Sequence, residues 1–291
     1  MSATGSPGGG NTTTRMFRKT SGAILCPSCG RITNADAQVC LSCGFRRPGL
    51  WGFGAPLGKL VGALDVTKAI SAACVALYVL SLVIDPAAAL RPRGPLELLA
   101  PSGRALQRLG MTGAFAWYAG HWWTLITAIY LHGGILHILF NVLWIRQLGP
   151  AVEQLFGPAR LATIFTVAGV AGFALSDYAG VPFTIGASGS IFGLLGAMVA
   201  YGRQRGGVFG SLVLRQYGQW ALVLFIFGFL MSGVNNLAHA GGFAGGLLCA
   251  LLLGSRERRR EVGLDHLLAF AVIALTVLAF ALAFYQGFLA R

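Results

Sequence analysis

Long apolar runs separated by short polar segments make up most of the chain after residue 65. Several approach the roughly 20 apolar residues that an α-helix needs to cross a bilayer. We therefore expect an all-α polytopic membrane protein with seven transmembrane helices, the last of which follows a basic loop within residues 255–291. The predicted spans are Val66–Ile84, Gly134–Gln154, Arg160–Asp177, Gly186–Tyr201, Gln216–Met231, Val234–Gly254 and His266–Phe288.

The composition excludes an ordinary soluble protein. Of the 291 residues, 55% are hydrophobic and only 11% are charged, whereas a soluble chain has about a quarter charged residues. The net charge is +13, and a basic chain can bind nucleic acid. Here, however, the cations lie between hydrophobic segments and form no solvated face, so we expect a lipid bilayer and no nucleic acid as partner.

The basic residues also predict the orientation of the helices. They gather in loops on one side of the membrane, which the positive-inside rule makes cytoplasmic, and the N-terminus falls on the same side. We expect a bacterial inner-membrane protein with a cytoplasmic N-terminus. The long loop over 85–133 carries arginines on the outer side, but long loops follow the rule weakly. The cytoplasmic loops carry Arg160, Arg203, Arg205, Arg215 and Arg256–Arg260.

The polar N-terminal region contains a candidate metal site. Residues 1–22 are rich in Gly, Ser and Thr and are expected to be a disordered tail without a cleaved signal peptide. Within 23–46, two Cys-x-x-Cys pairs predict a zinc ribbon, because four thiolates suit tetrahedral Zn²⁺. Two disulfides or four idle thiols are the alternatives, which a reducing cytosol disfavours. The pairs are Cys26 with Cys29 and Cys40 with Cys43, and a linker over 47–65 follows.

Four polar side chains fall within the predicted spans at a similar depth. They are Ser188 in the fourth span, His239 in the sixth, and His137 with Asn141 in the second. A helix rise of about 1.5 Å per residue puts them in one layer, about 5 to 12 Å below the outer surface. Because polar groups in hydrocarbon are costly, this layer predicts a water-accessible functional site.

Acyl transfer is the chemistry that these groups fit. Ser188 is the expected nucleophile and neutral His239 its general base. The Ser188 backbone N–H, the His137 imidazole and the Asn141 amide are expected to stabilise the oxyanion. Asp177 is the only acid nearby, so we expect a Ser–His dyad without a third member. The glycines around Ser188 also have a simpler interpretation, since small residues let neighbouring helices approach closely.

Three motifs together resemble the rhomboid family of intramembrane serine proteases. The chain has counterparts of the family's HxxxN, GxSG and AHxxGxxxG motifs. The resemblance covers residues 66–254, where it implies a six-helix core, with the last span as an added seventh C-terminal transmembrane helix. It implies Ser188 and His239 as the dyad, His137 and Asn141 as oxyanion donors, and the helix around Trp220–Met231 as a lateral gate for substrate. The motif residues are His137 and Asn141; Gly186, Ser188 and Gly189; and Ala238, His239, Gly242 and Gly246.

Two positions depart from the family pattern. Trp123-Thr124 stands where the family usually has Trp-Arg, so an interfacial anchor is altered. Phe192 stands where the family often has a tyrosine that stacks on the catalytic imidazole, and it keeps the ring without the hydroxyl. Neither change removes a reacting group.

The resemblance implies an endopeptidase that cleaves single-span membrane-protein substrates near the exoplasmic face, with no cofactor required for catalysis. A helical substrate must unwind before attack, so helix-weak residues near the cut are favoured. One alternative is an inactive rhomboid-like protein that binds or escorts membrane clients. Another is a transporter, against which the absence of carboxylates at the membrane centre argues. For the ribbon we expect docking of a cytosolic protein partner or regulation of the protease.

Overall fold

The structure is a computed structural model that describes residues 20–26, 31–49, 65–90, 99–231, 233–254, 261 and 263–290. The chain divides into two compact units, Met1–Leu64 and Asp65–Arg291, which are described separately. The predicted disordered tail falls almost wholly outside the described residues, as do the second cysteine of the first pair, most of the linker and the run Arg256–Arg260.

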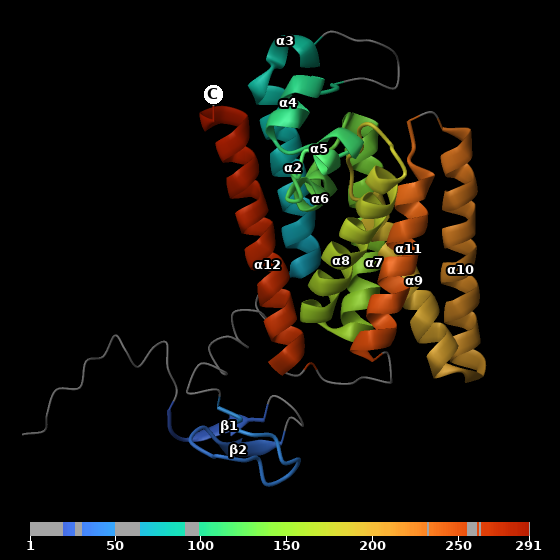
Figure 1. Ribbon diagram of the computed structural model, residues 1–291. Helices are drawn as coiled ribbons and strands as arrows, with labels where there is room; N and C mark the ends of the chain where they lie inside the picture. The colour runs from blue at the N-terminus through green and yellow to red at the C-terminus, as the bar shows by residue number, and fades with distance from the viewer. Residues whose placement is uncertain are drawn as a thin grey trace, which may run out of the picture. The chain divides into compact units, whose positions relative to one another are not determined.

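In the described part of the larger unit the named secondary-structure elements are all helices (Figure 1). Seven helices in this described part have 18 or more residues: α2 (Val66–Ile84), α7 (Ile135–Phe156), α8 (Pro158–Tyr178), α9 (Ser188–Arg205), α10 (Gly207–Leu230), α11 (Asn236–Leu253) and α12 (Gly263–Phe284). The shorter helices are α3 (Pro86–Ala89), α4 (Gly103–Arg108), α5 (Ala114–Tyr118), α6 (Thr124–Thr127), η2 (Ala128–Tyr130) and the π-helical turn η3 (Tyr285–Leu289).

Six of the long helices in the described residues are long and apolar enough to cross a membrane: α2, α7, α8, α10, α11 and α12 with η3. The chain is therefore an integral multi-pass membrane protein, as predicted, and its C-terminal apolar helix is present. The remaining predicted span, the fourth, corresponds to α9, which is rich in Gly and Ser and is less apolar. This low apolarity is tolerated because almost all residues of α9 from Gly189 to Gly202 are buried against protein and do not face lipid.

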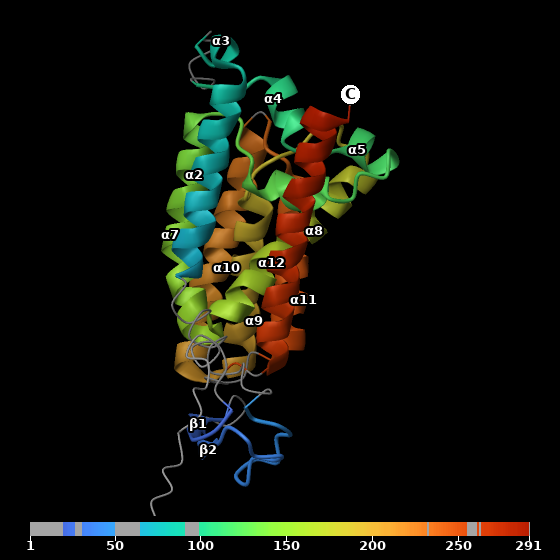
Figure 2. The ribbon, with the colours of Figure 1, turned by 90° about the vertical axis from the view of Figure 1, so that its left-hand side faces the viewer.

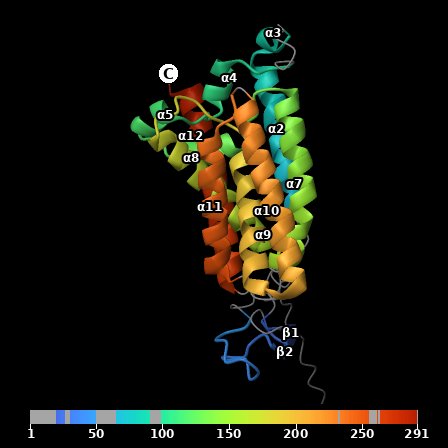
Figure 3. The same cartoon turned by 90° about the vertical axis from the view of Figure 1, so that its right-hand side faces the viewer.

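α9 lies at the centre of the bundle and contacts α7, α8, α10 and α11 (Figure 3). α2 packs against α7, and α12 packs against α8 (Figure 2). The close approach of α9 and α11 depends on their glycines. A Cβ at Gly242 would overlap the backbone of Gly189, and one at Gly246 would overlap the backbone of Gly193. The small-residue packing expected from the sequence is therefore present, and it brings the start of α9 against the start of α11.

Two of the predicted helix bounds were too short. α10 begins at Gly207 rather than Gln216, and α9 continues to Arg205 rather than ending at Tyr201. In both cases the helix runs past the apolar segment into basic residues. A span estimated from hydropathy ends at the first charge, whereas the helix itself continues. In α9 the last turn carries Arg203 and Arg205, where cations interact favourably with the helix dipole.

The segment before α9 is not helical, as the short fourth span predicted. It pairs with the loop between α2 and α7: Thr112 forms a β-bridge with Thr184, and Ala114 N–H donates to the Val181 carbonyl at 2.8 Å. Gly186 N–H donates to the Ala128 carbonyl at 2.9 Å. These hydrogen bonds satisfy backbone groups that could not be left exposed to lipid.

Polar contacts tie the start of α12 to the start of α8. Arg160 and Asp265 form an ion pair of 2.8 Å, with side chains only 1% and 4% exposed. Glu261 accepts hydrogen bonds from the first-turn N–H groups of Ala159 and Arg160 at 2.6 and 3.1 Å, which caps α8. Burial raises the pKa of the Glu261 carboxyl.

Candidate active site and cysteine cluster

Ser188 and His239 meet across the contact between α9 and α11. Ser188 is the first residue of α9, and His239 lies in the first turn of α11. The Ser188 Oγ is 2.9 Å from the Nε2 of His239. His239 is only 6% exposed. The two residues predicted from separate motifs are therefore within hydrogen-bonding distance, which is the arrangement that a serine nucleophile and its base require.

Phe192 forms one wall of this pair. It follows Ser188 by one helical turn, and its ring stacks on the His239 imidazole with centroids 4.2 Å apart and planes 17° from parallel. The ring contact expected at this position is thus present without a hydroxyl. Stacking limits the orientations open to the imidazole.

A second hydrogen bond reaches His239 from a residue to which we had assigned no role. The Oδ1 of Asn236 lies 3.1 Å from Nδ1 of His239. The sequence signal was the i, i+3 spacing on one helix, which puts two side chains on the same face. Asp177, the acid considered near the site, instead accepts a hydrogen bond from Thr112 at 2.6 Å.

His137 lies against the loop that precedes Ser188. The Gly133 N–H donates to its Nδ1 at 3.2 Å, so the neutral imidazole carries its proton on Nε2. Gly186 has a φ of +119°, and a Cβ there would lie 2.5 Å from that Nε2. The Nε2 of His137 is therefore directed at Gly186, two residues before Ser188.

Asn141 is buried one turn after His137 on the same face of α7. Its Nδ2 donates to the His137 carbonyl at 2.8 Å, which leaves the second amide hydrogen for another acceptor. The structure thus brings the two HxxxN residues together on α7, as predicted.

Asn235 fixes the start of α11 near the site. Its Oδ1 accepts from the Ala238 N–H at 3.1 Å, which caps the helix. Its Nδ2 donates to the hydroxyls of Ser176, at the end of α8, and Thr184, before α9. One side chain therefore joins α11 to the end of α8 and to the segment that leads into Ser188.

Thr124, the departure from the family's Trp-Arg pair, is 5% exposed and hydrogen bonded. Its hydroxyl lies 3.0 Å from that of Thr112, which donates to Asp177 on α8. The loop between α2 and α7 is therefore joined to α8 at this position through neutral hydroxyls rather than through an arginine.

Comparison with known proteins gives the family. The family model described as "Rhomboid domain" matches residues 119–256. The rhomboid protein YdcA of Bacillus subtilis is 34% identical over 148 residues, which cover 48% of this chain and 72% of YdcA. The chain belongs to the rhomboid family. The rhomboid protease GluP of Bacillus subtilis is 37% identical over 163 residues, 54% of this chain but only 31% of GluP.

The family includes both active and inactive members. "Inactive RHOMBOID-like protein 8" of Arabidopsis thaliana is 29% identical over 174 residues, which cover 58% of this chain and 49% of that protein. The rhomboid family is one of intramembrane serine proteases, so membership supports a protease. Whether a given member cuts depends on its own site residues.

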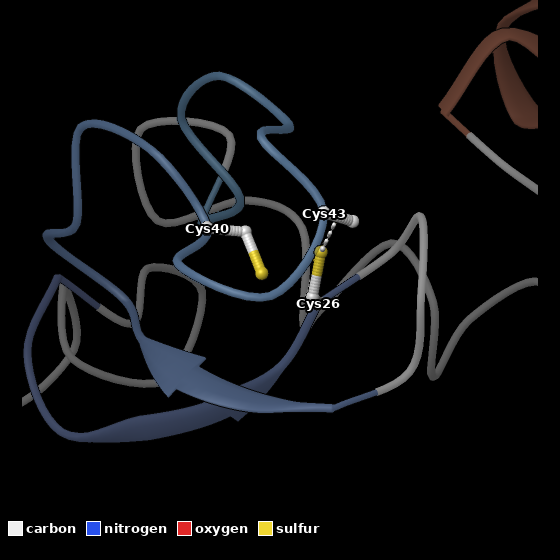
Figure 4. A group of neighbouring side chains, drawn as sticks. All are labelled: Cys26, Cys40 and Cys43. Atoms are coloured by element: carbon white, nitrogen blue, oxygen red, sulfur yellow. Dashed lines mark hydrogen bonds between the residues drawn. The ribbon is translucent and has the colours of Figure 1, made fainter.

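The smaller unit holds a cysteine cluster (Figure 4). Strands β1 (Ala23–Leu25) and β2 (Ile32–Asn34) pair antiparallel, and Cys26 directly follows β1. Cys40 and Cys43 lie in a second turn, closed by a bridge between Val39 and Arg46.

The geometry of this cluster fits a metal ion. The sulfurs of Cys26, Cys40 and Cys43 all lie within 4.8 Å of one another, and those of Cys26 and Cys43 are 3.7 Å apart. Four thiolates around Zn²⁺ at about 2.3 Å would place sulfurs about 3.8 Å apart. The described cysteines form no disulfide with one another. The fourth predicted ligand, Cys29, lies outside the described residues.

The environment of Cys40 favours the thiolate that a metal binds. The backbone N–H of Ser42, with smaller contributions from Cys26 and Cys43, lowers the pKa of the Cys40 thiol to about 6. Metal ligation requires deprotonated sulfur. These three cysteines can therefore hold a metal ion.

Proposed function

We propose that this protein is an intramembrane serine endopeptidase that cuts transmembrane segments with Ser188 as nucleophile and His239 as general base. The 2.9 Å contact between the Ser188 Oγ and the His239 Nε2 carries this proposal. It is supported by the family, whose named members include proteases. The chain matches only part of GluP, so the activity is argued from the site itself.

The reaction follows from the positions of these groups. Nε2 of His239 takes the hydroxyl proton as Ser188 Oγ attacks the scissile carbonyl carbon. The oxyanion lies at the N-terminus of α9, where the Ser188 backbone N–H and Nε2–H of His137 can donate to it, joined by the Asn141 amide. The imidazolium then protonates the leaving amine, and water hydrolyses the acyl-enzyme by the same steps.

The substrates proposed are single-span membrane proteins. The exposed apolar side chains of the helices, such as Leu222 and Phe229 of α10, support a position of Ser188 within the bilayer, where membrane-embedded peptide bonds can reach it. Their segments must unwind locally, so glycine or proline near the cut favours cleavage. The helix around Trp220–Met231, the last part of α10, is the proposed lateral gate.

The basic residues support an orientation with the site facing the exoplasmic side of a bacterial inner membrane. Arg203 and Arg205 end α9, at the opposite end from Ser188, and Arg160 lies near the start of α8. The positive-inside rule makes the arginine end cytoplasmic. The N-terminal unit is proposed to lie in the cytoplasm, where it binds structural zinc through Cys26, Cys29, Cys40 and Cys43 and docks a cytosolic partner.

Co-expression with a labelled single-span substrate tests the proposal. The wild-type protein should release a fragment cut near the outer end of the span, and Ser188→Ala should abolish it. Ser190→Ala is the matched control, because Ser190 lies on the same helix and is fully buried. Cleavage that persists in Ser188→Ala would end the assignment. A wild-type protein that binds the substrate without cutting it would indicate the inactive, client-binding alternative.

A further inference from the structure

Asn236 holds the His239 imidazole from the side opposite Ser188. The Asn236 Oδ1 lies 3.1 Å from Nδ1 of His239, while Nε2 of the same ring lies 2.9 Å from the Ser188 Oγ. From these two contacts we propose that Asn236 is a positioning residue for His239, so that hydrogen bonds link Ser188 to His239 and His239 to Asn236. This inference rests on the proposed protease function.

The amide oxygen selects the productive form of the imidazole. An amide oxygen only accepts, so it binds Nδ1 in the tautomer that carries its proton there. Nε2 then has the free lone pair that accepts the Ser188 proton. The other tautomer would direct an N–H at Ser188 and prevent proton transfer. Once the ring is protonated, the N–H···O bond becomes charge-assisted and stronger, as with the asparagine of Cys–His–Asn hydrolases.

Gly228 on helix α10 lacks a side chain, and the Asn236 amide occupies the space beside it. A Cβ at Gly228 would overlap the Asn236 Oδ1 and would lie 3.0 Å from its amide carbon. A side chain at position 228 must therefore displace the amide from His239. Gly218, earlier on the same helix, has no atom within 4 Å of such a Cβ, which makes it a matched position without the contact.

Other polar groups near the site have different partners. Asn235, the adjacent amide, caps α11 and bonds to Ser176 and Thr184 rather than to His239. Asp177 accepts from Thr112. Among the described residues, His137 on α7 is the other titratable side chain that lies near His239. Asn236 is thus the polar group placed to orient the ring.

The test is the rate at which a fluorophosphonate labels the full-length protein, measured across pH. Asn236→Leu should slow labelling about tenfold at neutral pH, as expected for one lost hydrogen bond. Asn236→Asp keeps the acceptor and should restore labelling. Its negative charge stabilises the imidazolium, so the acidic limb of its profile should move to higher pH.

Gly228→Ala should remove the hydrogen bond between Asn236 and His239 without changing Asn236 itself. It should slow labelling as Asn236→Leu does, with Gly218→Ala unchanged, and the double variant should be no slower than either single one, because both remove the same bond. If Asn236→Leu does not fold, the comparison of Gly228→Ala with Gly218→Ala decides. Wild-type rate and pH profile in folded Asn236→Leu or Gly228→Ala would overturn the positioning role while leaving the protease proposal intact. A wild-type protein that is not labelled would overturn both.

Discussion

Gly186 controls the space around His137. Its φ of +119° is costly for any residue with a Cβ, and a Cβ would also lie 2.5 Å from Nε2 of His137. Position 186, two residues before Ser188, therefore requires glycine for two reasons: its backbone conformation and its close contact with the His137 imidazole. The two effects can be separated experimentally, because another glycine with positive φ has no neighbour.

We predict that Gly186→Ala lowers the rate of substrate cleavage by tenfold or more, because the methyl group displaces the proposed oxyanion donor. Gly180→Ala is the control, since Gly180 has a φ of +88° and open space around it. Both variants should lose about 1–2 kcal/mol of stability from backbone strain, but only Gly186→Ala should lose activity. Equal activity in both would contradict the placement of His137.

At this scale, the predictable residues were those whose chemistry is unusual in a membrane. Ser188, His239, His137 and Asn141 stood out as polar groups in apolar spans, and their motifs placed them. Asn236 did not stand out, because an amide at the outer end of a span is an ordinary helix-start residue. Its contact with His239 depends on the glycine at 228, which lies on another helix.

The contact between α9 and α11 is the element that brings Ser188 to His239. It is built from backbone against backbone, with Gly193 facing Gly246. Such close packing requires glycine at these positions, because any larger residue would push the two helices apart.

Gly246→Ala should therefore destabilise the protein by about 1–3 kcal/mol, the cost of overpacking a tight contact. Gly218→Ala on α10 should be neutral or stabilising, because alanine favours a helix and meets no neighbour there. Thermal unfolding in detergent measures both. Equal unfolding temperatures for the two variants would contradict a glycine-dependent helix contact.

The existence and order of the long helices could be predicted because hydrocarbon demands long apolar segments. Their ends could not, because α9 and α10 extend past the apolar segment into arginines. The lower apolarity of α9 also follows from its place at the centre, which only the packing of the other helices reveals.

At the scale of the whole molecule, α12 is held to the six-helix core by a buried ion pair. Arg160 and Asp265 are almost fully buried, so removal of one charge breaks an ion pair that is shielded from water. Asp265→Asn should cost about 3–5 kcal/mol. Asp65→Asn, the same change in an exposed pair with Lys68, should leave the unfolding temperature nearly unchanged, because exposed pairs contribute little. A similar effect from both would show that α12 does not depend on this pair.

The two units should also be separable in function. Cys40→Ser is expected to abolish the bound zinc of the full-length protein, measured by elemental analysis, while labelling of Ser188 continues. Cys249→Ala, in the buried part of α11, should retain the metal. Loss of zinc in the Cys249 variant, or its retention in the Cys40 variant, would place the metal elsewhere.

The most direct measurement is to locate a fluorophosphonate adduct by mass spectrometry of the full-length protein. A hydroxyl activated by a neighbouring imidazole reacts, whereas the other serines do not. The account predicts one adduct, on Ser188, that disappears in His239→Ala. An adduct on another serine, or none in a folded wild-type protein, would contradict it.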